Sequence, residues 1–150
     1  MRRMKRRTSL LMFSAIAGAS LLSACAVPSS PAAGGTAQLR VTGTVTYRER
    51  IALDPAADIV VQLLDVSLMD APSKVLAEQR IKANGKQVPF TYELKVDAAR
   101  IDPRMRYAVS ARITRGDQLL FINDTQYSVL TQGGATSADL VLVRVTQAPR

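Results

Sequence analysis

The sequence has no histidine and no tryptophan, and it has a single cysteine, Cys25. One cysteine cannot form a disulfide within the chain. Without histidine, the chain lacks the usual general base of hydrolases and half of the Cys/His ligand set of zinc sites. We therefore expect no disulfide framework, no metal, no cofactor and no catalytic residues, and we predict that the protein is not an enzyme.

Basic residues outnumber acidic ones by 20 to 12, but much of the excess lies at the N-terminus. Five of the 20 fall within the first seven positions, namely Arg2, Arg3, Lys5, Arg6 and Arg7. The remaining chain has 15 basic and 12 acidic residues, with no basic stripe and no interleaved aromatics. A surface that follows nucleic-acid phosphates needs such a stripe, so we expect no nucleic-acid partner.

Residues 1–24 have the order of a secretory signal peptide. A basic segment precedes an apolar run over residues 8–22, and small residues follow. Ser14, Gly18 and Ser20 interrupt the run, which falls short of the roughly 20 apolar residues that a membrane-spanning helix needs. Cleavage is therefore favoured over a retained membrane anchor, and we predict it between Ala24 and Cys25.

The segment Leu22-Ser23-Ala24-Cys25 resembles the lipobox of bacterial lipoproteins. In that motif the cysteine thiol accepts a diacylglyceryl group, and the amine freed by cleavage accepts a further chain such as palmitate. Several chains anchor stably because each buried methylene adds about 0.8 kcal/mol, whereas a single chain binds only marginally. We predict that Cys25 is lipidated and attaches the protein to a membrane.

Ala26 stands where such lipoproteins carry an aspartate when they are retained in the inner membrane. The resemblance therefore implies an outer-membrane location, with the domain facing the periplasm. The Arg6-Arg7 pair is similar to a weak twin-arginine signal, so the general and the twin-arginine export routes both stay open. Residues 25–37 are rich in Pro, Ser, Gly and Ala, and we predict a lipidated N-terminus followed by a flexible tether.

The folded domain is expected over residues 38–146. Short runs rich in Val, Ile, Leu, Thr and Tyr alternate there with turn residues, and no stretch keeps a 3.6-residue apolar period. The pattern predicts an all-β fold, specifically a two-sheet antiparallel β-sandwich of the immunoglobulin type, with a small open barrel as the alternative. The strands are expected near residues 38–47, 58–68, 74–82, 88–96, 105–114, 118–123, 126–131 and 138–146.

Two local patterns refine this prediction. Tyr107 follows Pro103 at a strand start, as in the tyrosine corner of immunoglobulin-like sandwiches, where the hydroxyl bonds back to the corner. A plain core tyrosine is the alternative. Residues 59–61 and 140–143 are apolar at every position, which indicates either central strands or a face that contacts another molecule.

The mature chain resembles the YbaY/YscW group of lipoproteins over roughly residues 39–145. The resemblance is carried by Val41-Thr42-Gly43-Thr44-Val45, Val61-Gln62-Leu63-Leu64-Asp65-Val66-Ser67, Val88-Pro89-Phe90, Tyr107-Ala108-Val109-Ser110-Ala111-Arg112-Ile113 and Leu120-Phe121-Ile122-Asn123-Asp124-Thr125. The group includes type III secretion lipoprotein chaperones, or pilotins, which escort an outer-membrane secretin and promote its assembly. The resemblance implies a non-catalytic, protein-binding lipoprotein of the outer membrane.

Asp65, Asn123 and Asp124 are the polar residues of interest, because they lie in strands or at strand ends, where an unpaired polar group is costly. Hydrogen bonding to nearby backbone amides is the simpler interpretation. A periplasmic hydrolase or hydrolase inhibitor would instead require converging carboxylates in one cleft.

Two non-catalytic functions remain open. An assembly chaperone with an outer-membrane protein partner should expose an apolar strip or an unprotected edge strand. A structural or small-ligand-binding envelope lipoprotein, with no dedicated protein partner, should have a pocket lined by Phe90, Tyr92, Phe121 or Tyr127. No pattern in the sequence specifies an oligomeric state.

Overall fold

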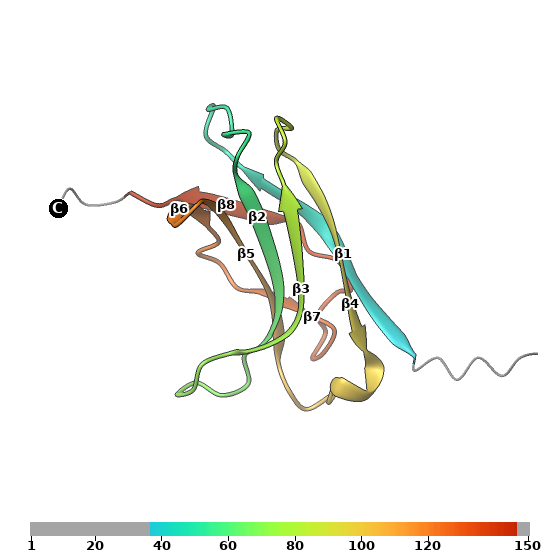
Figure 1. The fold of residues 1–150 in the computed structure, drawn as a ribbon. Coiled ribbons are helices and arrows are strands. Elements are labelled where there is room, and N and C mark those ends of the chain that lie inside the picture. Colours follow the sequence, from blue (N-terminus) through green and yellow to red (C-terminus); the bar gives the residue numbers. More distant parts are fainter. Residues whose placement is uncertain (1–36, 147–150) are drawn as a thin grey trace, which may run out of the picture. The chain divides into compact units, whose positions relative to one another are not determined.

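The computed structural model describes residues 37–146, so the predicted signal peptide, Cys25 and nearly all of the predicted tether lie outside the described residues. These residues form eight strands and one short 3₁₀ helix (Figure 1). Within them, no helix is long and apolar enough to span a membrane. The elements are β1 (Gln38–Tyr47), β2 (Asp58–Asp65), β3 (Lys74–Lys82), β4 (Phe90–Asp97), η1 (Ala98–Arg100), β5 (Tyr107–Arg115), β6 (Gln118–Ile122), β7 (Tyr127–Val129) and β8 (Leu140–Arg144).

The all-β prediction is confirmed, and each of the eight predicted strands is present with its ends within three residues of the prediction. Turn residues explain why the strand ends could be predicted this closely. The loop between β5 and β6 has two residues, and Gly116 adopts a φ of 55° there. Asn84 and Gly85 have φ values of 45° and 79° in the turn after β3. Such left-handed backbone suits Gly and Asn, so these residues end strands where the sequence indicated.

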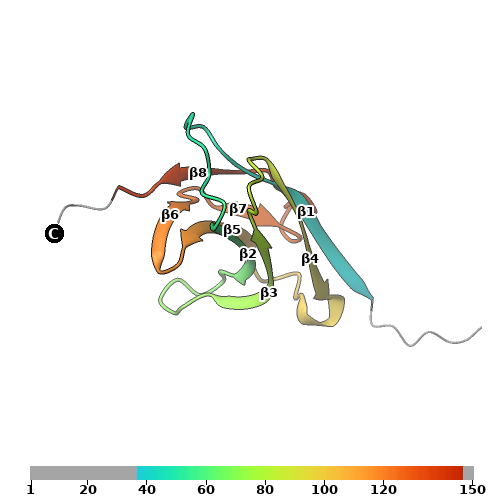
Figure 2. The same cartoon turned by 45° about the horizontal axis from the view of Figure 1, so that its top comes forward.

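The two-sheet sandwich is not confirmed. The strands form one hydrogen-bonded path in the order β3-β2-β5-β6-β8-β1-β4, with β7 paired to β5. The path curls until its two end strands, β3 and β4, lie side by side (Figure 2). The result is a nearly closed barrel, because β8 pairs with both β6 and β1 and so joins the two sheets of the expected sandwich. Nor is the sheet wholly antiparallel, since β8 runs parallel to β1.

Gly43 permits the segment that leads into β8 to run close beside β1, in the parallel direction. The Ala138 N–H donates to the Thr42 oxygen at 2.9 Å, and the Thr42 N–H donates to the Thr136 oxygen at 3.1 Å. A Cβ atom at Gly43 would lie 1.9 Å from the Ala138 oxygen. That oxygen also accepts a 2.7 Å hydrogen bond from the Tyr92 hydroxyl. The lack of a side chain at position 43 therefore allows the start of β8 to lie this close to β1.

Side chains from strands all around the barrel fill its interior. Along β4, residues 90, 92, 94 and 96 are buried and their neighbours 91, 93 and 95 are exposed, as in a strand with one face on the core. β2 lies between β3 and β5 in the sheet, and Val60 is buried there along with Ile59 and Val61, beside its register partners Arg80 and Arg112. Tyr47 and Phe121 stack with ring centroids 4.4 Å apart. The apolar run at 59–61 is thus a central strand.

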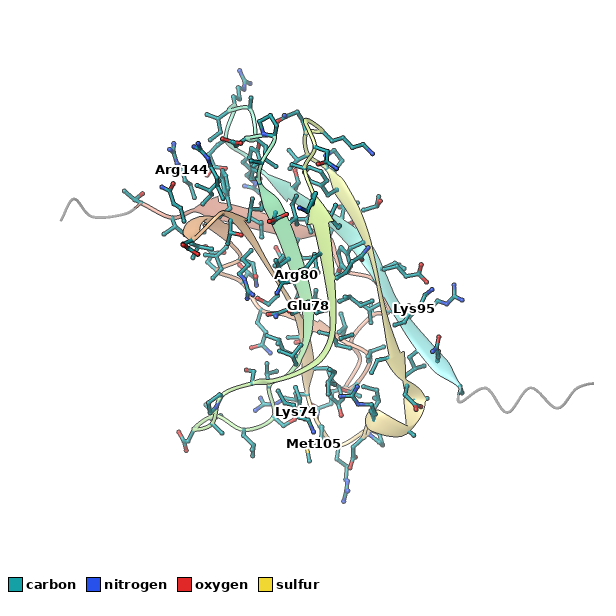
Figure 3. The ribbon with its side chains drawn as sticks, in the orientation of Figure 1. Lys74, Glu78, Arg80, Lys95, Met105 and Arg144 are labelled. Carbon is teal, nitrogen blue, oxygen red and sulfur yellow. The ribbon has the colours of Figure 1, made fainter. Side chains whose placement is uncertain are left out.

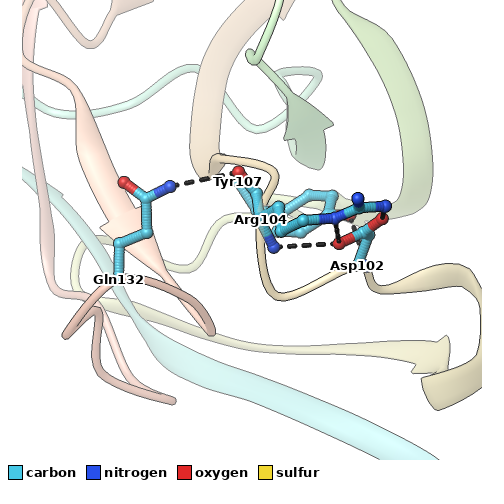
Figure 4. A network of polar contacts seen from close by, with 4 residues as sticks. All are labelled: Asp102, Arg104, Tyr107 and Gln132. Carbon is cyan, nitrogen blue, oxygen red and sulfur yellow. Dashed lines mark hydrogen bonds and ion pairs between the residues drawn. The ribbon is translucent and has the colours of Figure 1, made fainter.

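The tyrosine corner is confirmed. The Tyr107 hydroxyl accepts a 2.9 Å hydrogen bond from the Asp102 N–H. The Asp102 carboxylate in turn binds the Arg104 backbone N–H at 2.9 Å and its guanidinium at 2.8 and 3.1 Å (Figure 4). These hydrogen bonds from Arg104 lower the pKa of Asp102 to about 2. Gln132 donates to the Arg104 oxygen at 3.2 Å and ties the corner to the loop after β7.

The first described residue and two loops lie at one end of the barrel, which we call the tether end. The Ala98 N–H donates to the Ala37 oxygen at 2.8 Å, which joins the start of β1 to η1. The Val66 N–H donates to the Arg106 oxygen at 2.9 Å, which joins the β2–β3 loop to the start of β5. The loops around residues 48–57 and 83–89 lie at the opposite end (Figure 1).

Candidate functional site

The two end strands of the sheet, β3 and β4, meet in a seam that side chains close. The Glu93 N–H donates to the Gln79 side-chain oxygen at 2.7 Å, and the Arg100 guanidinium donates to the Leu76 oxygen at 3.1 Å. A shallow groove of about 460 Å³ remains, lined by Ala77, Glu78, Gln79, Glu93, Leu94 and Lys95. The seam thus replaces the ladder of backbone hydrogen bonds that would complete a closed barrel.

Charged side chains cover this seam. Glu93 lies 3.2 Å from Arg40 and 3.8 Å from Lys95, and Glu78 lies 2.7 Å from Arg80 on the outer face of β3 (Figure 3). Hydrogen bonds from Arg80 and Gln62 lower the pKa of Glu78. Charges along strand edges oppose pairing with other strands. The structure therefore does not offer these edges as the unprotected strand that a chaperone could use.

A second groove, the β8 groove, has a volume of about 360 Å³ and is lined by both charged and apolar residues. Its walls come from β8, from the segment leading into β7 and from the chain after β1. They consist of Arg48, Glu49, Asp124, Thr125, Tyr127, Val141, Leu142 and Val143. Ile122, which pairs with Val143 across β6 and β8, is 37% exposed, as is Val143 itself. Apolar surface and a cavity thus occur together at this strand.

The β8 groove exists because β8 changes partners along its length. Residues 140–142 pair with β1, and residues 143–144 pair with β6. On the side away from β1, the Val141 N–H donates to the Tyr127 hydroxyl at 3.0 Å rather than to another strand. A backbone edge held by one side chain, beside exposed valine, is a surface to which an extended peptide can bind.

Glu49 adds a polar feature to the β8 groove that the sequence did not predict. One carboxylate oxygen accepts a long, 3.4 Å hydrogen bond from the Arg144 N–H. The other oxygen is buried and has no hydrogen-bond partner among the described residues. A buried acceptor without a partner is costly, and a donor from another molecule would remove that cost.

The three polar residues that the sequence singled out do not form one site, because Asp65 lies at the tether end whereas Asn123 and Asp124 follow β6. Asn123 accepts hydrogen bonds from the Ala111 N–H and the Ser110 hydroxyl, at 2.8 and 3.0 Å, and its amide donates to the Thr125 oxygen. Asp65 accepts from the Ser67 N–H at 3.0 Å at the tether end. The simpler interpretation, local hydrogen bonding, is therefore confirmed for Asn123 and Asp65.

Asp124 accepts a 3.1 Å bond from the Thr125 hydroxyl and also lines the β8 groove. Of the three predicted polar residues, it is thus the one that belongs to a groove in the described part of the chain. Among residues 37–146, no group of three or more acidic, histidine or cysteine side chains could hold a metal ion.

The predicted aromatic pocket does not form as a unit. Phe90, Tyr92 and Phe121 are buried in the core, where they fill space. Burial, with a smaller contribution from Asp139, raises the pKa of Tyr92, so its hydroxyl stays protonated and donates to Ala138. Tyr127 alone of the four predicted residues lines a groove described in residues 37–146. The ligand-binding hypothesis thus has no aromatic cavity among the described residues.

Comparison with protein families identifies the chain. Residues 36–142 match the model of YscW, the type III secretion system lipoprotein chaperone. The chain belongs to the YscW family. This confirms the resemblance inferred from the sequence, and the match spans all of the barrel from β1 to the middle of β8.

Two relatives of this YscW-family chain are similar over most of the described barrel. The uncharacterized lipoprotein YbaY of Escherichia coli (strain K12) is 49% identical over 110 residues, which are 73% of this chain and 57% of YbaY. The chain thus spans little more than half of that relative. An alternative pilotin from the type II secretion system of Vibrio cholerae superposes with a TM-score of 0.71 at 43% identity. That match covers 74% of this chain and all of the pilotin.

Proposed function

We propose that this protein is a pilotin-like lipoprotein that binds an outer-membrane channel protein of the secretin class and promotes its assembly. One observation carries the proposal: the described barrel matches a pilotin over that protein's whole length, at 43% identity and a TM-score of 0.71. The family is described as a lipoprotein chaperone, which agrees with a binding role rather than a catalytic one.

The anchor in this proposal is Cys25, lipidated after cleavage behind Ala24. Its acyl chains hold the protein at the outer membrane, with the barrel in the periplasm. Lipidation supports the chaperone role physically, because a protein that travels with its own acyl chains delivers a bound partner to the membrane where the partner must assemble. The lipobox-like Leu22-Ser23-Ala24-Cys25 and the description of YbaY as a lipoprotein support this assignment.

The contact with the partner is assigned to the β8 groove. Val143 and Ile122 supply exposed apolar area, and the edge of β8 near Val141 supplies backbone groups. The unpartnered oxygen of Glu49 would accept a hydrogen bond from a basic or amide group. The chemistry suits an apolar segment of the partner that carries one donor side chain.

Crosslinking in cells tests the proposed function. A tagged wild-type protein and a Cys25→Ser variant are crosslinked, the outer-membrane fraction is purified, and the captured proteins are identified. We expect one outer-membrane channel or assembly protein to be captured by the wild type and lost with Cys25→Ser. Recovery of the tagged protein without any specific partner would support a passive or small-ligand-binding lipoprotein instead.

A matched pair of variants tests the groove. Val143→Lys places a charge within the β8 groove on an exposed position, so it should leave the fold intact and abolish capture of the partner. Thr91→Lys places the same charge on the exposed face of β4 and should capture as the wild type does. Equal capture by both variants would show that the partner does not bind at the β8 groove. The proposal that the protein has a partner would still hold.

A further inference from the structure

Exposed apolar side chains concentrate at the tether end. Among the described residues, seven large hydrophobic side chains are exposed, and four of them lie at this end of the barrel. Leu68 and Met69, at the tip of the β2–β3 loop, are 72% and 89% exposed, and Val75 and Met105 accompany them. The loop projects away from the sheet in Figure 1, and Met105 lies at the same end in Figure 3.

The loop that carries Leu68 and Met69 is held at its base. Ser67 accepts a 2.8 Å hydrogen bond from the Arg106 N–H, and its own N–H donates to Asp65 at 3.0 Å. The Val66 N–H donates to the Arg106 oxygen at 2.9 Å. These bonds fix where the loop leaves the barrel, so the apolar tip stays directed outward.

Cations lie at the same end of the barrel as this apolar tip. Lys74, Arg100 and Arg106 have no ion-pair partner among the described residues. Most carboxylates at this end are already engaged: Asp65 with Ser67, Asp97 with the Ala99 N–H, and Asp102 with Arg104. Asp70 is the remaining one. Lys and Arg beside apolar residues are typical of surfaces that meet lipid headgroups, since their stems bury while their charges reach phosphate.

The start of the described chain lies at the same end. Ala37 is hydrogen-bonded to Ala98, and 11 residues separate it from Cys25. As a flexible coil of this length, the tether would have an end-to-end distance of about 20 Å, and its fully extended reach would be about 40 Å. The barrel itself has a diameter of roughly 30 Å. Anchoring at Cys25 would therefore keep the tether end closer to the bilayer than the opposite end.

We propose that the tether end, through Leu68, Met69 and the cations Lys74, Arg100 and Arg106, rests on the lipid bilayer in which the protein is anchored. This inference depends on the lipid anchor of the proposed function and adds an orientation to it. The tip inserts into the headgroup region and the barrel stands on the membrane with its opposite end in solvent. A short tether makes even a weak interfacial contact effective, because it keeps the local concentration of the loop at the surface high.

The test uses the full mature lipoprotein, purified from membranes and reconstituted in vesicles of phosphatidylethanolamine and phosphatidylglycerol. An environment-sensitive fluorophore is attached through Met69→Cys in one preparation and through Lys86→Cys in another. Cys25 does not react because its thiol carries the lipid. Lys86 is exposed in the turn after β3, at the end opposite the tether, so it is the matched control.

With brominated lipid in the vesicles, the probe at residue 69 should lose about half of its fluorescence or more, because interfacial apolar groups enter about 5–10 Å into the headgroup region. The probe at residue 86 should lose almost none. A Leu68→Asp substitution added to the residue 69 preparation should weaken the quenching, and a Thr91→Lys substitution should not.

The contrary outcomes are distinct. If the protein floats with the vesicles but the two probes are quenched equally, or neither is quenched, the orientation is wrong and the lipid anchor stands. If the probe at residue 69 changes only when an outer-membrane protein partner is added, the tether end is a protein-docking surface and the bilayer contact is refuted. If the protein does not float at all, the anchor of the proposed function fails, and this inference fails with it.

Discussion

Gly43→Ala should destabilise the barrel more than the same substitution at Gly85, Gly116 or Gly133, which have open space around them. The new Cβ would lie 1.9 Å from the Ala138 oxygen and 2.9 Å from the Tyr92 hydroxyl. Both contacts are inside van der Waals distance, and the first involves the segment before β8, which two hydrogen bonds to Thr42 hold in place. That segment must therefore move away from β1.

The size of the effect follows from two contributions. Overpacking of this kind costs about 1–3 kcal/mol. Displacing the Ala138 oxygen also removes the 2.7 Å hydrogen bond from the Tyr92 hydroxyl, a loss of about 1 kcal/mol. The free energy of unfolding should thus fall by about 2–4 kcal/mol, out of the roughly 5–15 kcal/mol typical of a domain. For a domain of this length the Tm should fall by about 8–16 °C.

Urea and thermal unfolding, followed by circular dichroism, measure both quantities. The control is Gly85→Ala, because a Cβ there would meet nothing within 4 Å although φ is 79°. Its cost is the backbone term alone, about 1–2 kcal/mol. Gly43→Ala should also reduce capture of the partner, since it displaces the start of β8, whereas Gly85→Ala should not. Equal destabilisation by the two variants would show that the close approach at Gly43 is relieved without cost.

Three smaller perturbations test other parts of the structure. Tyr107→Phe leaves the Asp102 N–H without its acceptor and should lower the free energy of unfolding by about 1 kcal/mol in a urea titration; an unchanged midpoint would contradict the corner's role. Burial raises the pKa of Tyr92, so the stability it contributes is fully present below the unfolded value of about 10 and is lost as the pH rises beyond it. Unfolding measured across that range should depend on pH less steeply in Tyr92→Phe than in the wild type. Arg104 holds the pKa of Asp102 at about 2. The stability that the ionised Asp102 contributes is therefore present above the pKa of the unfolded chain, about 3.9, and is lost as the pH falls toward 2. Asp102→Asn should remove that acid dependence, and a wild-type acid profile in this variant would refute the assignment.

The strands could be predicted from the sequence because their signals are local. Alternation along residues 90–96 and glycine or asparagine at the turns each specify an element without reference to the rest of the chain. The tyrosine corner is also local, since only five positions separate Tyr107 from the Asp102 N–H that it accepts. Local patterning was therefore sufficient to predict the eight strands and the corner.

The closure of the barrel could not be predicted in this way, because it depends on contacts between residues far apart in the chain. Joining two sheets into one requires β8 to pair in parallel with β1, about 95 residues earlier, before it pairs with β6. Gly43 allows that approach, yet in the sequence it is a single glycine inside an apolar alternation. The reason for a glycine at this position becomes clear only in the structure, where the Ala138 oxygen lies against it.

The candidate site was predictable only in part, for the same reason. The run 140–143 is apolar at every position, and the sequence left open whether it is a central strand or a contact face. The structure shows a strand that is buried in part. Leu140 and Leu142 are buried, whereas Val143 is exposed beside the β8 groove. Glu49 gave no signal, because an acidic residue after a strand is ordinary until its oxygen is found buried without a partner.

The β8 groove and the tether end lie at different places along the barrel, and the separation bears on how a pilotin-like protein would work. Arg48 and Glu49, which line the groove, follow the last residue of β1, whereas the tether enters at its first. Ten residues of strand span about 30 Å. Because strands in a barrel are tilted, a barrel standing on the bilayer by its tether end would hold the groove at most about 30 Å into the periplasm. The groove would be free to bind a partner while the acyl chains stay in the membrane. A partner bound at the tether end instead would compete with the bilayer for Leu68 and Met69, so Leu68→Asp would then abolish both vesicle contact and capture. In the arrangement proposed, that substitution weakens only the contact with lipid, and Val143→Lys abolishes only capture.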